Sequence, residues 1–125
     1  MDLDSIRTYC LSLPHATEDI QWGNDLLFRI SGKIFTGISL DPPHSLSFKC
    51  TPEKFDELIE LEGIIPAPYT ARNKWVMLER PDALGDREIK SLIENSYQMI
   101  FAKLTKKAQA ELGSTKKTTR PPAKK

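Results

Sequence analysis

The residue types best suited to nucleophilic chemistry are a histidine and a cysteine close together in the chain, because an imidazole can activate a neighbouring thiolate. His44 and Cys50 meet that description in sequence. Cys50, however, alternates with Leu46 and Phe48, which predicts that its side chain points into the core, whereas His44 lies in a polar turn. The chain also lacks a glycine-rich phosphate loop, a nucleophile elbow and paired metal-ligand spacing. We therefore predict that it is not an enzyme and needs no cofactor.

A second group of chemically capable residues is acidic and follows Thr51. Clustered carboxylates can bind a hard cation weakly. Such a run is far more often the solvated face of a helix, so we predict no metal site. The residues concerned are Glu53, Asp56, Glu57, Glu60 and Glu62.

Basic and aromatic residues in the predicted sheet indicate a nucleic-acid surface. Such binding needs Lys and Arg for phosphates and aromatic rings for stacking on bases. We expect Arg29, Phe35 and Lys49 to emerge side by side from an open sheet face. Exposed Lys and Arg also serve solubility, and Trp75 can equally fill the core. The full set of predicted nucleic-acid-binding residues is Arg29, Lys33 at a hairpin tip, Phe35, Lys49, Arg72, Lys74 and Trp75.

Charge is divided unevenly along the chain. Residues 1–102 contain 10 Lys and Arg against 16 Asp and Glu, a net charge of −6, whereas residues 103–125 contain 8 basic residues and one acid, a net charge of +7. A basic arm attracts DNA or RNA in a salt-sensitive, sequence-independent way. It could also attract an anionic membrane, but it lacks bulky apolar anchors, so we favour nucleic acid, DNA over RNA, and no membrane partner.

Size and composition predict one soluble cytoplasmic domain, which we expect to be monomeric. The chain has 125 residues, of which 39% are hydrophobic and 28% charged. No stretch approaches the roughly 20 apolar residues that span a bilayer. The first residues are acidic and lack the features of a signal peptide. Two cysteines are too few for a disulfide framework.

Hydrophobic periodicity predicts an α+β domain over residues 1–112. A helix capped by Asp2 ends at Pro14, and residues 15–25 form a loop. An antiparallel meander follows over residues 26–30, 34–40 and 45–50, with Ile34, Thr36 and Ile38 on its buried face.

The second half begins with a helix signal, in which Thr51 caps and Pro52 takes the first helical position. We predict a loop over residues 64–73, a strand over 74–78 whose faces cannot be assigned, and a long helix that Asp86 caps and that runs to Leu112. Residues 113–125 are rich in Ser, Thr, Lys and Pro and should form a disordered basic tail.

These residues resemble the MmcQ/YjbR family of small bacterial proteins over about residues 1–108. Each motif alone is weak, but the ordered set is fairly specific. The matching segments are Leu13-Pro14 with Ala16-Thr17-Glu18, Gly32-Lys33-Ile34-Phe35, Phe48-Lys49-Cys50 with Pro52, Pro66-Ala67 with Tyr69, Trp75-Val76 and Ser96-Tyr97.

The resemblance implies a fold like that of bacterial frataxin (CyaY), with helices packed on one face of an antiparallel sheet. Members of the family are described as DNA-binding on the basis of that fold, and a fold alone does not fix a function. The function we predict is therefore a DNA-binding module that contacts phosphate through its sheet face, hairpin tip and tail. The alternative is a domain that binds a protein or small molecule in the groove beside the Pro66–Trp75 loop.

Overall fold

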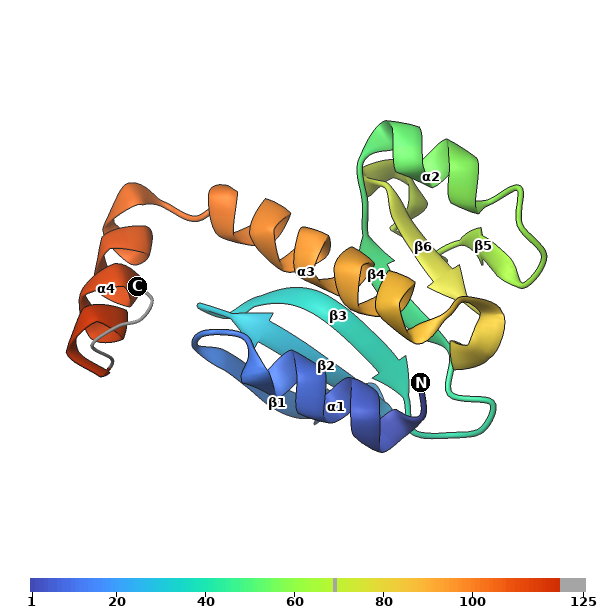
Figure 1. The fold of residues 1–125 in the computed structure, drawn as a ribbon, viewed down its shortest axis with the longest axis horizontal. Helices are drawn as coiled ribbons and strands as arrows, with labels where there is room; N and C mark the ends of the chain where they lie inside the picture. The colour runs from blue at the N-terminus through green and yellow to red at the C-terminus, as the bar shows by residue number, and fades with distance from the viewer. Residues whose placement is uncertain (69, 120–125) are drawn as a thin grey trace.

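The computed structural model describes residues 1–68 and 70–119, with side chains as far as Leu112. It is an α+β structure, as predicted (Figure 1). In chain order its elements are α1 (Leu3–Ser12), β1 (Ala16–Gln21), β2 (Asp25–Ile30), β3 (Lys33–Ser39), β4 (Leu46–Lys49), α2 (Pro52–Leu58), β5 (Ile64–Pro66), the short 3-10 helix η1 (Ala71–Asn73), β6 (Trp75–Leu78), the 3-10 helix η2 (Pro81–Ala83), α3 (Asp86–Ala102) and α4 (Lys106–Thr119).

The strands form one six-stranded sheet in the order β1-β2-β3-β4-β6-β5, and every neighbouring pair is antiparallel. Helix α3 crosses β3 and β4, α1 packs on β1, and α2 lies against β5 and β6 (Figure 1). The hydrophobic core is the layer between these helices and the sheet. No helix of the described residues packs on the opposite face of the sheet.

The N-terminal caps of α1 and α2 form as the sequence predicts. The Asp2 carboxylate accepts a hydrogen bond from the Ser5 amide at 2.8 Å, which caps α1. The Thr51 hydroxyl accepts one from the Lys54 amide at 3.2 Å, and Pro52 occupies the first turn of α2.

The sequence prediction missed the two edge strands, β1 and β5. We expected loops over residues 15–25 and 64–73. An edge strand needs only one partner and tolerates polar residues and proline, so β1 shows little hydrophobic alternation and β5 can end at Pro66. Both strands form because β2 and β6 offer them unpaired backbone groups.

The prediction for β3 was wrong at Phe35, which we expected on the outer face. Thr36 and Ile34 pair with consecutive residues of β2, so Phe35 is the extra residue of a β-bulge. The bulge turns Phe35 into the core, where it is fully buried and its ring meets that of Tyr97 edge-on at 5.3 Å. It also turns Ile34 to the outer face, where we had not expected it.

The long C-terminal helix that we predicted is two helices. Gly85 rather than Asp86 occupies the N-cap of α3, and the chain breaks helical geometry after Ala102. The Thr105 hydroxyl then caps α4 by accepting a hydrogen bond from the Ala108 amide at 3.1 Å. The Gln109 side-chain amide donates to the Phe101 and Ala102 carbonyls at the end of α3 and to the Leu104 carbonyl just beyond it, which satisfies groups left free by the break.

Helix α4 continues past Leu112, where we expected the ordered domain to end, as far as Thr119. Once a helix has nucleated, each further residue adds one backbone hydrogen bond, so a polar segment can extend it. The remainder of the predicted disordered tail, residues 120–125, lies outside the described residues. No helix in the described part of the chain is long and apolar enough to cross a membrane.

Candidate functional site

A groove of about 720 Å³ runs across the sheet face opposite α1 and α3. Most of its surface is apolar, and the side chains that define it come from β2, β3, β4, β6, the β1–β2 turn and the loop after β5. They include Trp22, Asp25, Leu27, Ile34, Trp75 and Met77.

The floor of the groove is a row of cross-strand partners. Leu27 pairs with Gly37, Gly37 with Ser47, and Ser47 with Met77. At the centre of the row Gly37 has no side chain and that of Ser47 is small, which leaves a hollow between the larger Leu27 and Met77. A Cβ atom on Gly37 would lie 3.1 Å from the Leu27 Cδ2 atom, so the floor is closely packed even though it is open above.

Two walls rise from this floor. One is the turn between β1 and β2, where Trp22 is 72% exposed and its backbone has a φ of 53°, a left-handed conformation that costs a non-glycine residue about 1–2 kcal/mol. The other is the loop after β5, which contributes Pro68 and Thr70. The two tryptophans of the chain, Trp22 and Trp75, both line the groove.

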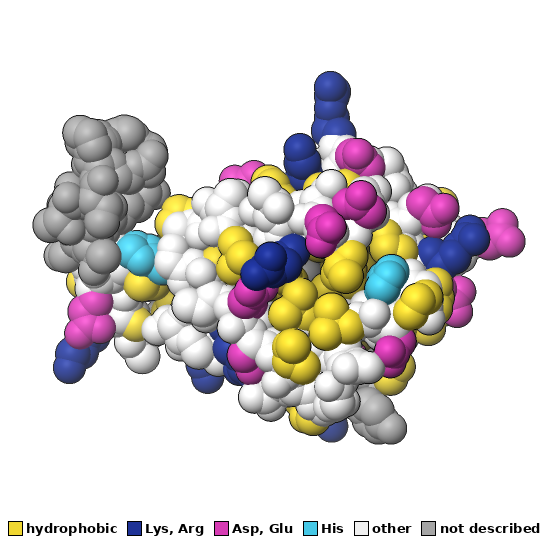
Figure 2. Space-filling view, turned by 90° about the horizontal axis from the view of Figure 1, so that it is seen from below, with side chains coloured by type: hydrophobic (Ala, Val, Ile, Leu, Met, Phe, Trp, Pro, Cys, Tyr) yellow, Lys and Arg dark blue, Asp and Glu magenta, His cyan; other side chains and the backbone are white. Residues whose placement is uncertain are grey.

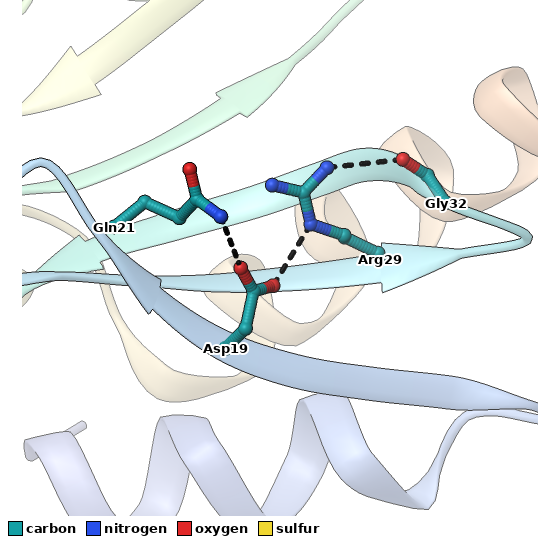
Figure 3. A network of polar contacts seen from close by, with 4 residues as sticks. All are labelled: Asp19, Gln21, Arg29 and Gly32. Atoms are coloured by element: carbon teal, nitrogen blue, oxygen red, sulfur yellow. Dashed lines mark hydrogen bonds and ion pairs between the residues drawn. The ribbon is translucent and has the colours of Figure 1, made fainter.

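Arg29 lies on the same sheet face but is engaged within the protein (Figure 3). Its Nε atom donates to the Asp19 carboxylate at 2.8 Å and its Nη1 atom to the Gly32 carbonyl at 3.0 Å. The hydrogen bond from Arg29 lowers the pKa of Asp19, to which Gln21 also donates. The guanidinium charge is therefore balanced where we expected it to meet a phosphate.

Lys49 is the cross-strand partner of Trp75, and its ammonium group donates to the Asn73 carbonyl at 2.6 Å. Burial lowers the pKa of Lys49, and the positive charge of Lys103 lowers it further. Arg29 and Lys49 lie on different strands, with Ile34 of β3 opposite Arg29. Phe35, predicted between them, is in the core.

The other predicted nucleic-acid-binding residues lie in separate parts of the structure. Lys33 is exposed at the start of β3, and Arg72 is exposed in η1. The Lys74 ammonium lies 4.9 Å from the centre of the Phe55 ring, towards α2. Trp75 lines the groove. The predicted set therefore does not form one basic and aromatic patch.

The cysteines and histidines are distributed as the sequence indicated. Burial raises the pKa of Cys10 to about 12 and that of Cys50 to about 11, so both thiols are protonated at neutral pH. The Cys50 thiol donates to the Lys74 carbonyl at 3.4 Å, and His44 Nδ1 lies 3.0 Å from the Ser39 carbonyl oxygen. Among the described residues, no three His, Cys, Asp or Glu side chains are placed to hold a metal ion.

A buried hydroxyl on the core side of the sheet links β3 and β4, the two strands at the centre of the groove floor. Ser96 of α3 is fully buried, and its hydroxyl donates to the Phe35 carbonyl of β3 at 2.7 Å. The same oxygen accepts a hydrogen bond from the Lys49 amide of β4 at 3.0 Å. Helix α3 therefore bridges β3 and β4 beyond the point where their own ladder ends at Thr36 and Phe48.

From the sequence we predicted Trp75 and the loop beside it as binding residues, but we missed the opposite wall of the groove. We read residues 15–25 as a polar loop, which hid the role of Trp22 and Asp25. A large aromatic residue within a polar turn was the available signal. Gly37 was a second signal, since a glycine inside a strand often marks a close approach or a hollow.

Comparison with known proteins agrees with this fold. The YjbR family matches residues 11–99. A Deinococcus radiodurans protein with the domain DUF419 is 25% identical, with a TM-score of 0.80 over 89% of this chain and 87% of that one. A Pseudomonas syringae protein is also 25% identical, with a TM-score of 0.66 over 79% of this chain and 98% of that one. No protein of curated function matches significantly. Because the family match covers well over half of its length, this chain belongs to the YjbR family.

Proposed function

We propose that this protein is a non-enzymatic binding domain that holds a small molecule in the groove on its open sheet face. The observation that carries the proposal is the groove of about 720 Å³, with its apolar lining and few polar groups. Small-molecule sites are typically concave, mostly apolar and roughly 300–1,000 Å³ in volume. This is the alternative that the sequence indicated beside the Pro66–Trp75 loop.

The placement of the tryptophans supports the same function. Indole rings provide a large contact area and a polar N–H group, which is why they are common in binding sites. Trp22 is 72% exposed, although burial of such a side chain is favourable. A ligand in the groove would cover part of this surface.

The chain carries its own reporter for the test, because both of its tryptophans line the groove. A fragment library titrated against the full chain should yield ligands that change tryptophan emission and raise the melting temperature. The variant Ser47→Leu fills the centre of the floor and should abolish both effects. Ser91→Leu is the matched control, because Ser91 is exposed on α3. Hits that bind the Ser47→Leu variant unchanged would refute the groove as the site.

Charge segregation supports a second candidate, nucleic-acid binding through the C-terminal segment. Residues 103–125 carry a net charge of +7, against −6 for the rest of the chain. Attraction of this kind depends strongly on salt. Fluorescence anisotropy with labelled DNA and RNA, on the full chain and on a 1–112 truncation, would test it. Equal binding by both proteins would refute a role for the segment beyond residue 112.

A further inference from the structure

We propose that the ligand of the groove carries a positively charged amine, which Asp25 and Trp22 recognise at one end of an apolar body. This inference rests on the proposed function, because it assigns the chemistry of a ligand in the same groove. Two observations support it. Asp25 differs from neighbouring acidic residues in its hydrogen-bond partners, and the exposed indole of Trp22 lines the same groove.

Asp25 is the carboxylate that lines the groove, and its side chain is half-buried. Among the described residues, no hydrogen bond or ion pair engages it. Neighbouring acids differ in this respect, since Asp19 binds Arg29 and Asp41 accepts a hydrogen bond from Asn24. A partly buried carboxylate beside apolar surface is stabilised by a cationic partner. None of the described residues that line the groove is a Lys or Arg, so a ligand could supply that partner.

Trp22 provides the second element of cation recognition. It lies three residues before Asp25 in the β1–β2 turn and lines the same groove. The face of an indole attracts ammonium groups more strongly than other aromatic side chains do. Figure 2, which views the molecule from the side of α1 and β1, shows hydrophobic side chains on this side of the molecule with both acidic and basic ones around them. The combination of an exposed indole with a carboxylate that no described residue pairs favours an amine over an anion.

The rest of the groove sets the shape of the ligand. Asp25 pairs with Ser39, whereas Trp75 pairs with Lys49, so Asp25 and Trp75 lie near opposite ends of the strands. Asp25 on β2 and Trp75 on β6 are also three strands apart, so they are separated by about 14 Å across the sheet at 4.8 Å per strand and by about 13 Å along it at 3.3 Å per residue. Between the ends lie Gly37, Ser47 and Met77, which offer no charge. A ligand with an amine beside Asp25 and an apolar chain or ring of about 10 Å would extend from there over the uncharged floor of the groove.

The effect of ligand charge can be measured with three probes that share a phenyl-alkyl chain and differ in the charge of the end group. They are 4-phenylbutylamine, 4-phenylbutanol and 4-phenylbutyrate. Each is titrated into the full-length protein while tryptophan emission is followed, with calorimetry to confirm affinity. We expect the amine to bind at least tenfold more tightly than the alcohol, and the carboxylate to bind most weakly. The variant Asp25→Asn should remove the advantage of the amine and leave the affinity for the alcohol unchanged. Trp22→Ala should weaken the amine more than the alcohol.

The control for Asp25→Asn is Asp56→Asn, which makes the same change in net charge at an exposed position of α2. It should leave all three affinities unchanged. Equal affinity for the three probes, lost in Ser47→Leu, would overturn the amine proposal while the groove remained a binding site. A preference for 4-phenylbutyrate would also overturn it. If Ser47→Leu had no effect on any probe that binds, the proposed function itself would fail.

Discussion

Replacing Ser96 with alanine tests the bridge between β3 and β4, on which the floor of the groove depends. The change removes a hydroxyl that donates to the Phe35 carbonyl at 2.7 Å and accepts from the Lys49 amide at 3.0 Å. Its effect should exceed that of an ordinary surface substitution, because two backbone groups lose a partner at once. Alanine also fits the space without a clash, so the lost hydrogen bonds dominate the result.

The size of the effect follows from the burial of the two groups. A buried polar group without a partner costs about 1–3 kcal/mol. The bond to the Phe35 carbonyl is buried, so we assign it about 2 kcal/mol, whereas the Lys49 amide is partly exposed and can recruit water, so we assign it about 1 kcal/mol. The sum, about 3 kcal/mol, is a large fraction of the 5–15 kcal/mol that stabilises a typical domain. For a chain of this size it corresponds to a drop of about 10 °C in melting temperature.

Urea denaturation followed by tryptophan emission measures the free energy of unfolding directly. The control is Ser12→Ala, because the Ser12 hydroxyl also donates to a backbone carbonyl, that of Tyr9 at 2.6 Å, but in an exposed position. It should change stability by less than about 0.5 kcal/mol. If Ser96→Ala cost no more than this control, the bridge would not stabilise the sheet and the reasoning would be refuted.

Three further substitutions test other contacts. Tyr97→Phe removes the hydroxyl that donates to the Pro14 carbonyl at 2.7 Å and should cost about 1 kcal/mol in urea unfolding; no change would refute that bond. Asp19→Asn should destabilise the protein at neutral pH, because it removes the ion pair with Arg29. Arg29 lowers the pKa of Asp19 below 3.8, so the stabilisation by this ion pair, and with it the difference from wild type, should vanish as the pH falls well below that value and Asp19 is protonated. A difference that persisted at pH 2 would contradict this. Burial raises the pKa of Cys10 from 9.0 to about 12, so the wild-type protein should lose stability as the pH rises through this range. Cys10→Ala should lose less stability over the same range, and parallel pH profiles of the two proteins would contradict this prediction.

Local and periodic signals in the sequence determined most of the fold. Asp2 and Thr51 cap their helices as predicted, because the hydrogen bonds of a cap join residues close in sequence. Alternation placed Leu46 and Phe48 on the buried face of β4, because side chains of a strand point to opposite sides in turn. The order of weak motifs was enough to indicate the YjbR family, which the comparison confirms.

Tertiary structure decided what the sequence pattern could not. A bulge depends on how two strands pair, so alternation along β3 alone could not show that Phe35 turns inward and Ile34 outward. Edge strands such as β1 form on a neighbouring strand and carry little pattern of their own.

The candidate site depended on the tertiary structure most of all. Residue types alone suggested that Arg29 and Lys49 were available to a nucleic acid, but the fold supplies Asp19 and the Asn73 carbonyl as their partners. It leaves Asp25 without such a partner among the described residues. Sequence determines which charges a chain contains, whereas only the packing of distant segments determines which of them are already paired.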